Sequence, residues 1–300
     1  MPDIVSNIPF LNNAKQGNNS IWRYLITIII SLFVASLVAG AFLAIFIVIW
    51  VLLFKQGLNV EFFLNQLLKD PLFLIVMVGL SFSISYLFLY LCVRFIHKKT
   101  FISIINTGNK VRWKKIGIGA LAWLGIIVIL DIISYLIDPG SFKISLNPQG
   151  FWILALLALI AFPIQASFEE VFFRGYLMQG ISLIFERPWV VLLVTSLFFA
   201  LLHWWNGGTV VMSLSIVMGT FIIGLMLGIL TMADNGIELA IGVHIINNIY
   251  VSVIHSSPDG GLGNLPSLVV SPSDPYLSPV ILALAAVILI GVLFRNRRED

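Results

Sequence analysis

The sequence predicts an all-α, polytopic integral membrane protein, a bundle of about eight transmembrane helices. Of its 300 residues, 59% are hydrophobic and only 10% are charged. A soluble domain has roughly 25% charged residues, so this chain has too few of them to cover a water-facing surface. Long apolar runs recur along the chain, and most approach the ~20 residues that a helix needs to cross a bilayer. These observations favour one integral bundle over several soluble domains.

Eight apolar runs are the candidate spans. In chain order they cover residues 24–54, 71–96, 116–137, 151–183, 188–204, 210–232, 237–255 and 276–294. The first and the fourth are longer than a bilayer requires, so we expect them to tilt, to kink or to extend into water. Within the fourth run, Pro163 predicts either a kink or a helix start. The fifth run is short and ends at Trp204 and Trp205, a pair typical of the membrane interface.

The distribution of Lys and Arg predicts the orientation, because cytoplasmic loops carry an excess of these residues. The loop between the second and third spans is basic and has no acidic residue among Arg94, Lys98, Lys99, Lys110, Arg112, Lys114 and Lys115. If this loop is cytoplasmic, thirteen basic residues lie inside and three lie outside. We therefore predict a multi-pass protein of the cell membrane with both termini in the cytoplasm.

Polar side chains inside the predicted spans are the strongest functional signal. They are Asp131, Glu169, Glu170, Arg174, His203, His244, Asn247 and Asn248. A charge at the bilayer centre costs roughly 2.5–3.5 kcal/mol on insertion scales, so such residues need partners or a wet cavity. Glu170 and Arg174 are four residues apart and can pair on one face of a helix. Glu169 has no such local cation, which leaves it free for another role.

Three interpretations of these residues are compatible with their spacing. Glu169 can act as a general base on a water held by His203, while His244 and Asn248 donate hydrogen bonds to the oxyanion of a carbonyl under attack. The same Glu169, His203 and His244 can instead bind a divalent metal such as Zn²⁺, with water in the open position. The cluster can also be a buried ion pair with a spare carboxylate that only braces the bundle. The single cysteine, Cys92, excludes an internal disulfide and a cysteine metal cluster.

Three short motifs occur in order within these spans. They are EExxxR at Glu169, Glu170 and Arg174, FxxxH at Phe199 and His203, and HxxxN at His244 and Asn248. On these motifs the sequence resembles the CPBP family of intramembrane proteases, also called the CAAX protease and bacteriocin-processing, or Abi, family. The resemblance covers about residues 150–255. Outside this range the chain resembles the family only in being hydrophobic.

The resemblance implies an intramembrane endopeptidase that hydrolyses a peptide bond of a membrane-associated peptide or protein within a conical polar cavity in the membrane. Glu169 with His203 would activate water, and His244 with Asn248 would form the oxyanion hole. Glu170 and Arg174 would be the supporting pair. The family pattern implies no required metal or other cofactor. The expected partners are the substrate and the lipid bilayer, without nucleic acid.

Two further polar residues lie outside the motifs. Asn247 is expected to be an amide that packs beside the site. Asp131 can pair with Arg174, line the cavity or, as the simplest expectation, form a hydrogen bond between two helices.

With the motifs assigned, the chain divides into four predicted segments. These are a polar N-terminal tail over 1–23, the first three spans over 24–149, a catalytic core of four spans over 150–255, and a loop, last span and basic tail over 256–300. Two other functions remain open. One is a non-enzymatic protein of bacteriocin-immunity or scaffold type that uses the polar cluster for binding. A proton-coupled transporter is less favoured, because the chain lacks repeated halves and a second acidic cluster.

Overall fold

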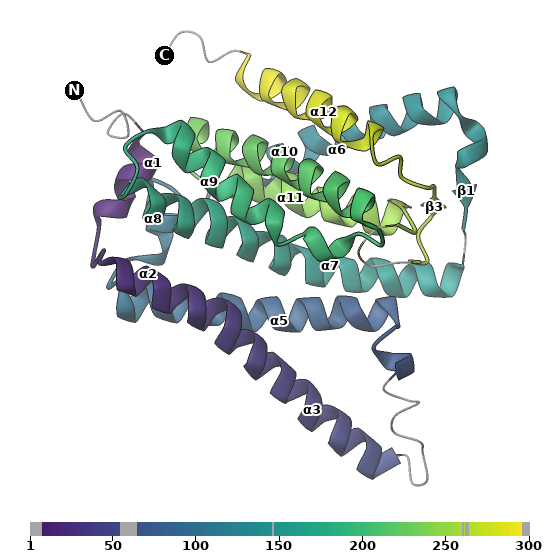
Figure 1. The fold of residues 1–300 in the computed structure, drawn as a ribbon, viewed down its shortest axis with the longest axis horizontal. Coiled ribbons are helices and arrows are strands. Elements are labelled where there is room, and N and C mark those ends of the chain that lie inside the picture. The colour runs from purple at the N-terminus through teal and green to yellow at the C-terminus, as the bar shows by residue number, and fades with distance from the viewer. Residues whose placement is uncertain (1–7, 55–64, 146, 260, 262–263, 296–300) are drawn as a thin grey trace.

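The computed structural model describes residues 8–54, 65–145, 147–259, 261 and 264–295 (Figure 1). Within this described part, seven helices are long and apolar enough to cross a membrane. They run Ile21–Leu53, Pro71–Ile96, Trp113–Ile137, Pro148–Ser182, Pro188–Asn206, Val210–Asp234 and Leu277–Phe294. The remaining predicted span is the shorter apolar helix Glu238–Ile254. The predicted helical membrane bundle is therefore confirmed, with each apolar run forming a helix.

Several of these helices combine α-helical and other turns. In chain order the elements of the spans are α2 (Ile21–Ile28), η3 (Ile29–Val34), α3 (Ala35–Phe54), α5 (Pro71–Leu91), η4 (Cys92–Ile96), α6 (Trp113–Ile137), α7 (Pro148–Glu170), η7 (Val171–Leu177), α8 (Met178–Ser182), α9 (Pro188–Leu201), η8 (Trp204–Asn206), α10 (Val210–Asp234), α11 (Glu238–Ile249), η9 (Tyr250–Ile254) and α12 (Leu277–Phe294). Among them, η3, η4, η7 and η9 are π-helical. Short π-helical segments inside α-helices are frequent at functional sites.

The helix starts follow local sequence signals. Pro71, Pro148 and Pro188 each occupy the first turn of a helix, where the missing N–H costs nothing. Asp70 accepts hydrogen bonds from the backbone of α5, and Asn147 does the same for α7. The α7 helix continues through Pro163 as far as Glu170, so the helix start considered at Pro163 is wrong. The start lies at Pro148 because this residue and its Asn147 cap form the stronger signal.

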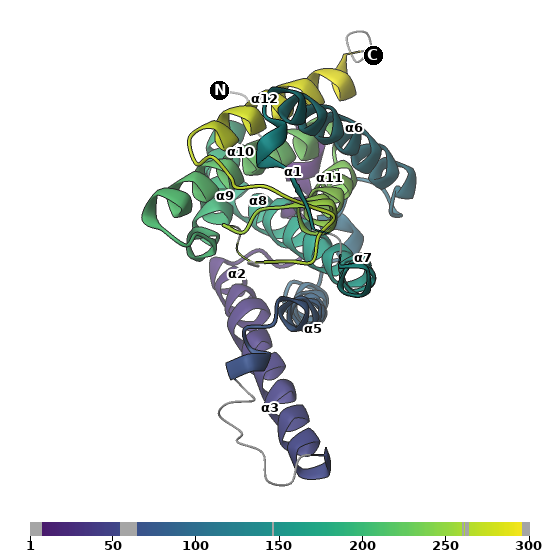
Figure 2. The ribbon, with the colours of Figure 1, turned by 90° about the vertical axis from the view of Figure 1, so that its right-hand side faces the viewer.

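Most helices pack side by side, whereas α3 leaves the bundle at an angle (Figures 1 and 2). At one end of the bundle the loops form a small sheet in the order β1-β3-β2. Its strands are β1 (Lys143–Ile144), β2 (His255–Ser256) and β3 (Val269–Val270). β3 pairs antiparallel with β1 and parallel with β2. This sheet ties together the connections that follow α6 and α11 and precede α12.

The α6 and α11 helices touch at glycines. A Cβ atom added at Gly242 would collide with the carbonyl oxygen of Ile116, and one at Gly119 would collide with that of Leu239. Small residues let helix backbones approach closely, which is a common way to pack helices in membranes. Because α11 carries His244 and Asn248, this contact helps to fix the position of the site.

An ionic network lies where α11 begins. Glu238 accepts hydrogen bonds from the Arg112 guanidinium, at 2.6 Å from Nη2, and from the Asn106 amide. Asp234, at the end of α10, is 3.1 Å from Arg112 and 2.9 Å from Lys115. The basic loop thus binds the α10–α11 turn as well as carrying the predicted orientation signal.

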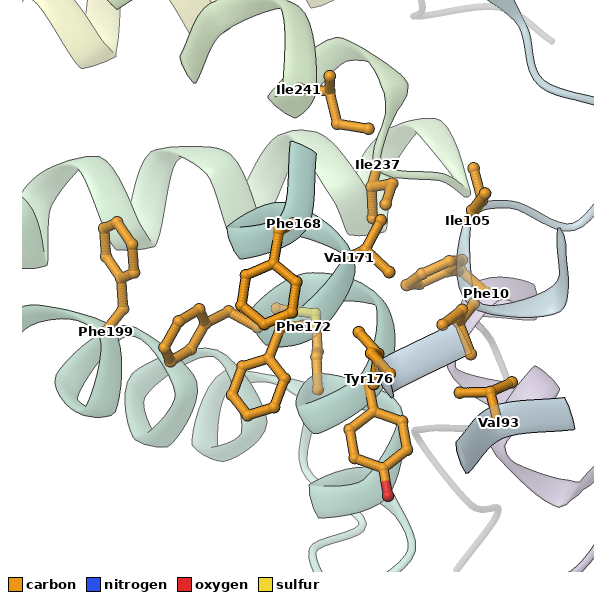
Figure 3. Close-up of a cluster of buried hydrophobic side chains, with 14 of the residues drawn as sticks. Phe10, Val93, Ile105, Phe168, Val171, Phe172, Tyr176, Phe199, Ile237 and Ile241 are labelled. Atoms are coloured by element: carbon orange, nitrogen blue, oxygen red, sulfur yellow. The ribbon is translucent and has the colours of Figure 1, made fainter. Parts of the chain in front are cut away.

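The segment before the first span packs into the core. Phe10 and Leu11 in α1 (Pro9–Asn12) are 0% and 1% exposed. Figure 3 shows Phe10 beside Ile105 and Val93, in a cluster that includes Phe172 and Tyr176 of η7. Asn13 donates hydrogen bonds to the carbonyl oxygens of Ser103 and Asn106. The polar composition of residues 1–23 did not predict these contacts.

Candidate active site

The EExxxR motif lies at the junction between α7 and the π-helical η7. Glu169 and Glu170 end α7, and Arg174 lies one turn later. Arg174 Nη1 donates to Glu170 Oε1 at 2.8 Å, and both side chains are almost fully buried. The predicted pairing of these two residues is therefore present. Arg174 also donates to the carbonyl oxygen of Gly224, and its guanidinium lies 4.3 Å from the centre of the Phe199 ring.

His244 lies between the two glutamates. Its Nδ1 donates to Glu170 Oε1 at 2.7 Å, and its Nε2 is 3.5 Å from Glu169 Oε2. Glu170 therefore holds both the cation on its own helix and an imidazole from α11. The orientation of the His244 ring is fixed by this contact and by a T-shaped contact with the Phe199 ring, whose centre is 5.9 Å away. The spacing of the motifs alone does not predict that Glu170 contacts His244.

Glu169 uses its two oxygens differently. Oε1 accepts a hydrogen bond from Gln165 Nε2 at 3.1 Å, one turn earlier on α7. Oε2 is buried and has no hydrogen-bond partner among the described residues, although His244 Nε2 lies near it. Buried polar atoms are nearly always satisfied, so an unsatisfied carboxylate oxygen beside a pocket is an indication of function. Glu170 Oε2 is also buried without a hydrogen-bond partner in the described part of the chain, but only the Glu169 oxygen lies beside His244 Nε2.

His203 follows α9 and is fixed by its own helix. Its Nδ1 donates to the Phe199 carbonyl oxygen at 2.8 Å, which requires the proton on Nδ1 because a carbonyl oxygen can only accept. The neutral ring then presents Nε2 as a hydrogen-bond acceptor. The Phe199 ring packs against the His203 ring with centres 4.7 Å apart. Phe199, the first residue of FxxxH, therefore contacts His203, His244 and Arg174.

A pocket of about 100 Å³ lies between the two histidines of the motifs and the two asparagines of α11. It is lined by Trp123, Phe199, His203, Thr220, Ile223, Met226, Val243, His244, Asn247 and Asn248. Three predicted site residues therefore share one pocket wall. Glu169 is not among the lining residues, but it lies 3.5 Å from one of them, His244, and Gln165 links it by hydrogen bonds to another, Asn248. The described residues contain no hydrogen bond between His203 and either glutamate.

Asn247 and Asn248 link α11 to two other helices, α6 and α7. Asn247 accepts from the Trp123 indole at 3.1 Å and donates to Asn248 Oδ1 at 3.3 Å. Asn248 donates in turn to Gln165 Oε1 at 3.3 Å. Asn247 therefore packs beside the site as an amide, in agreement with the expectation for it.

Asp131 lies in a separate polar cluster. Its Oδ2 accepts from the Tyr250 hydroxyl at 2.5 Å and contacts His255 Nδ1 at 2.7 Å. The other ring nitrogen of His255 is 2.6 Å from Ser271 Oγ. None of these residues lines the pocket, and Arg174 pairs with Glu170 instead. Pairing with Arg174 and lining the cavity are therefore both wrong for Asp131, whereas the hydrogen bond between two helices is present.

The possible metal ligands do not form a coordination site. Among the residues that the structure describes, no three His, Cys, Asp or Glu side chains are arranged to hold a metal ion. Glu169 and His244 are close, but His203 is not grouped with them in a set of side chains that could hold a metal ion. The arrangement of the described side chains therefore does not fit the alternative metal site at Glu169, His203 and His244.

Comparison with known proteins gives the family of this chain. Residues 149–250 match the family described as type II CAAX prenyl endopeptidase Rce1-like. The uncharacterized protein YyaK of Bacillus subtilis (strain 168) is 32% identical over 267 residues, which cover 84% of each chain. The chain belongs to the Rce1-like, or CPBP, family. No solved structure matches it.

Membership of the Rce1-like family confirms the family predicted from the three motifs. The matched residues contain every motif side chain, from Glu169 to Asn248. This is a peptidase family, and the apolar helices make the chain a multi-pass membrane protein. The sequence motifs do not include Trp123 or Gln165, which contact the site in the structure. Gln165 is one turn before Glu169 and could have been found by helical spacing, whereas Trp123 lies on a helix outside the matched residues.

Proposed function

We propose that the chain is an intramembrane endopeptidase in which Glu169 activates water to hydrolyse a peptide bond of a membrane-associated peptide or protein. The observation that carries the proposal is the buried Oε2 of Glu169, which has no hydrogen-bond partner among the described residues and lies 3.5 Å from His244. A carboxylate in such a site can take a proton from water as the water attacks a carbonyl carbon.

His203 supports the proposal through its tautomer. With the proton on Nδ1, its Nε2 can accept a hydrogen bond from the second O–H of the attacking water. This role makes His203 a group that positions water and assists proton removal. It requires no second carboxylate to orient the ring, because the Phe199 carbonyl does so.

His244 and Asn248 support stabilisation of the oxyanion. Asn248 uses one N–H for Gln165, which leaves its second N–H for the substrate. A donor role for His244 requires a proton on Nε2 in addition to the one on Nδ1. Together with the free N–H of Asn248, such a donor would stabilise the negative charge that develops on the carbonyl oxygen.

The test is cleavage by the purified protein in detergent or liposomes. The probes are fluorogenic peptides that carry an apolar helix or a lipid as a membrane anchor. We expect Glu169→Ala and His203→Ala to abolish cleavage while the proteins keep their unfolding temperature. The control is Glu186→Gln, which alters an exposed glutamate. Undiminished cleavage by both alanine variants would refute the mechanism and would favour a cluster that only braces or binds.

A further inference from the structure

A continuous chain of hydrogen bonds links the interior of α6 to Glu169. The Trp123 indole donates to Asn247 at 3.1 Å, and Asn247 donates to Asn248 at 3.3 Å. Asn248 donates to Gln165 at 3.3 Å, and Gln165 donates to Glu169 Oε1 at 3.1 Å. The chain thus crosses three helices, from α6 through α11 to α7.

All four hydrogen bonds run in the same direction. An indole N–H can only donate, and an ionised carboxylate can only accept, so the two ends cannot exchange roles. Each of the three amides between them accepts through its oxygen and donates through its nitrogen. Turning over any one amide would place like groups against each other on both sides. The side-chain orientation of Asn248 is therefore determined by Trp123 at one end and Glu169 at the other.

We propose that Trp123, Asn247 and Gln165 are positioning residues for the hydrolysis, an inference that rests on the proposed function. They hold the amide nitrogen of Asn248 with one N–H engaged and the other free for the oxyanion. Asn247, Asn248 and Trp123 line the pocket, so the ordered amides lie where substrate would bind. Trp123 is 0% exposed, so the first donor of the hydrogen-bond chain is held in place by the packing around it.

The chain also selects the reacting oxygen of Glu169. Gln165 occupies Oε1, so the proton taken from water goes to Oε2, the atom beside His244. Hydrogen bonds in series polarise one another, and the ionised carboxylate strengthens the donors that lead to it. Oxyanion stabilisation by Asn248 and base catalysis by Glu169 are thereby coupled through Gln165.

The first test is a double-mutant cycle on cleavage with Trp123→Phe and Gln165→Met. Each change breaks the chain at a different point, and the two residues do not bond to each other. We expect each single variant to lower kcat about 10- to 100-fold with little change in KM, because a misplaced catalytic group costs rates of this size. The double variant should lose much less than the product of the two losses, because the chain is already broken. A double variant that loses the full product of the two single losses in kcat would overturn the proposal.

The control pair combines Trp123→Phe with Gln66→Met, which alters an exposed glutamine. The free-energy losses caused by these two changes should add, since Gln66 is not part of the hydrogen-bond chain. If either single variant fails to fold, Asn247→Ala breaks the chain at a third point and takes its place in the cycle.

The second test does not depend on activity. The ultraviolet resonance Raman difference between wild type and Trp123→Phe isolates the Trp123 indole and reports the strength of its N–H hydrogen bond. We expect this signal to shift toward a weaker hydrogen bond in Gln165→Met, although Asn247 and Asn248 lie between Gln165 and Trp123. The signal should stay unchanged in Gln66→Met. An unshifted Trp123 signal in Gln165→Met would refute the coupling along the hydrogen-bond chain. A shifted signal in a protein whose wild type cleaves no peptide would refute only the proposed function.

Discussion

His244 is the residue whose surroundings differ most from what its spacing predicts. The HxxxN motif places it one turn from Asn248, and the structure adds a glutamate beside each ring nitrogen. Glu170 therefore does more than neutralise Arg174. It fixes the imidazole that faces Glu169, so a change at Glu170 affects both the stability of the bundle and the geometry of the site.

Glu170→Gln tests how much Glu170 contributes to the stability of the bundle. The substitution keeps the size of the side chain but leaves the buried Arg174 guanidinium without its carboxylate. Breaking a buried pair by removing one partner costs about 3–5 kcal/mol, so we expect a marked fall in the unfolding temperature in detergent. The double variant Glu170→Gln with Arg174→Met should recover part of the loss. Equal stability of the single and double variants would contradict this explanation.

Lys99 gives a prediction for the dependence of stability on pH. It is 5% exposed, and its ammonium donates to Gln179 at 2.8 Å. Burial lowers the pKa of Lys99 from 10.5 to about 8. The unfolded chain thus binds more protons between these values, and the free energy of unfolding should rise as pH increases from about 8 to 10.5 and fall again on acidification. Lys99→Met should flatten the profile in thermal unfolding between these pH values, whereas a slope that persists would exclude Lys99 as its source.

At the scale of elements, the sequence predicts the spans well and their contacts poorly. Proline at the first turn and the Asp70 and Asn147 caps are local signals, and they set the boundaries of α5 and α7. The burial of Phe10 depends on residues far along the chain, as does the pairing of Asp131 with Tyr250. No local pattern contains such partners. The same holds for Trp123, whose partner Asn247 lies 124 positions away.

The contact of α6 with α11 predicts the effect of adding one methyl group. Gly242→Ala places a carbon against the Ile116 backbone, so the helices must separate. Overpacking of this kind costs about 1–3 kcal/mol, and we expect a lower unfolding temperature together with reduced cleavage. Gly125→Ala is the matched control, because no atom lies within 4 Å of its added carbon. Loss of stability in both variants alike would show that the helix contact is not the cause.

At the scale of the whole molecule, buried charged side chains gather where the longest span meets the shortest of the eight apolar helices. The Pro148–Ser182 span carries Glu169, Glu170 and Arg174, and Glu238–Ile254 supplies His244. The large apolar faces of the other helices point outward, as a lipid-facing surface requires. A bundle of this kind keeps its polar atoms against each other and its apolar atoms toward lipid.

The predicted orientation can be tested in cells by cysteine labelling. Cys92 is buried, so background reaction with a membrane-impermeant maleimide should be low. Lys110 and Lys143 are exposed and lie on opposite sides of α6 along the chain. We expect Lys143→Cys to react in intact cells and Lys110→Cys to react only after the membrane is opened. The reverse result would invert the topology.

The role of Glu169 is tested most directly by Glu169→Gln. This variant keeps the shape of the side chain and an oxygen that can accept from Gln165, but it removes the carboxylate that takes a proton. General base catalysis contributes about 10²- to 10⁴-fold, so we expect kcat for an anchored peptide to fall by that factor while the unfolding temperature is kept. The exposed Glu186→Gln variant should cleave at the wild-type rate. Cleavage by Glu169→Gln at the wild-type rate would contradict the assignment of this carboxylate as the catalytic base.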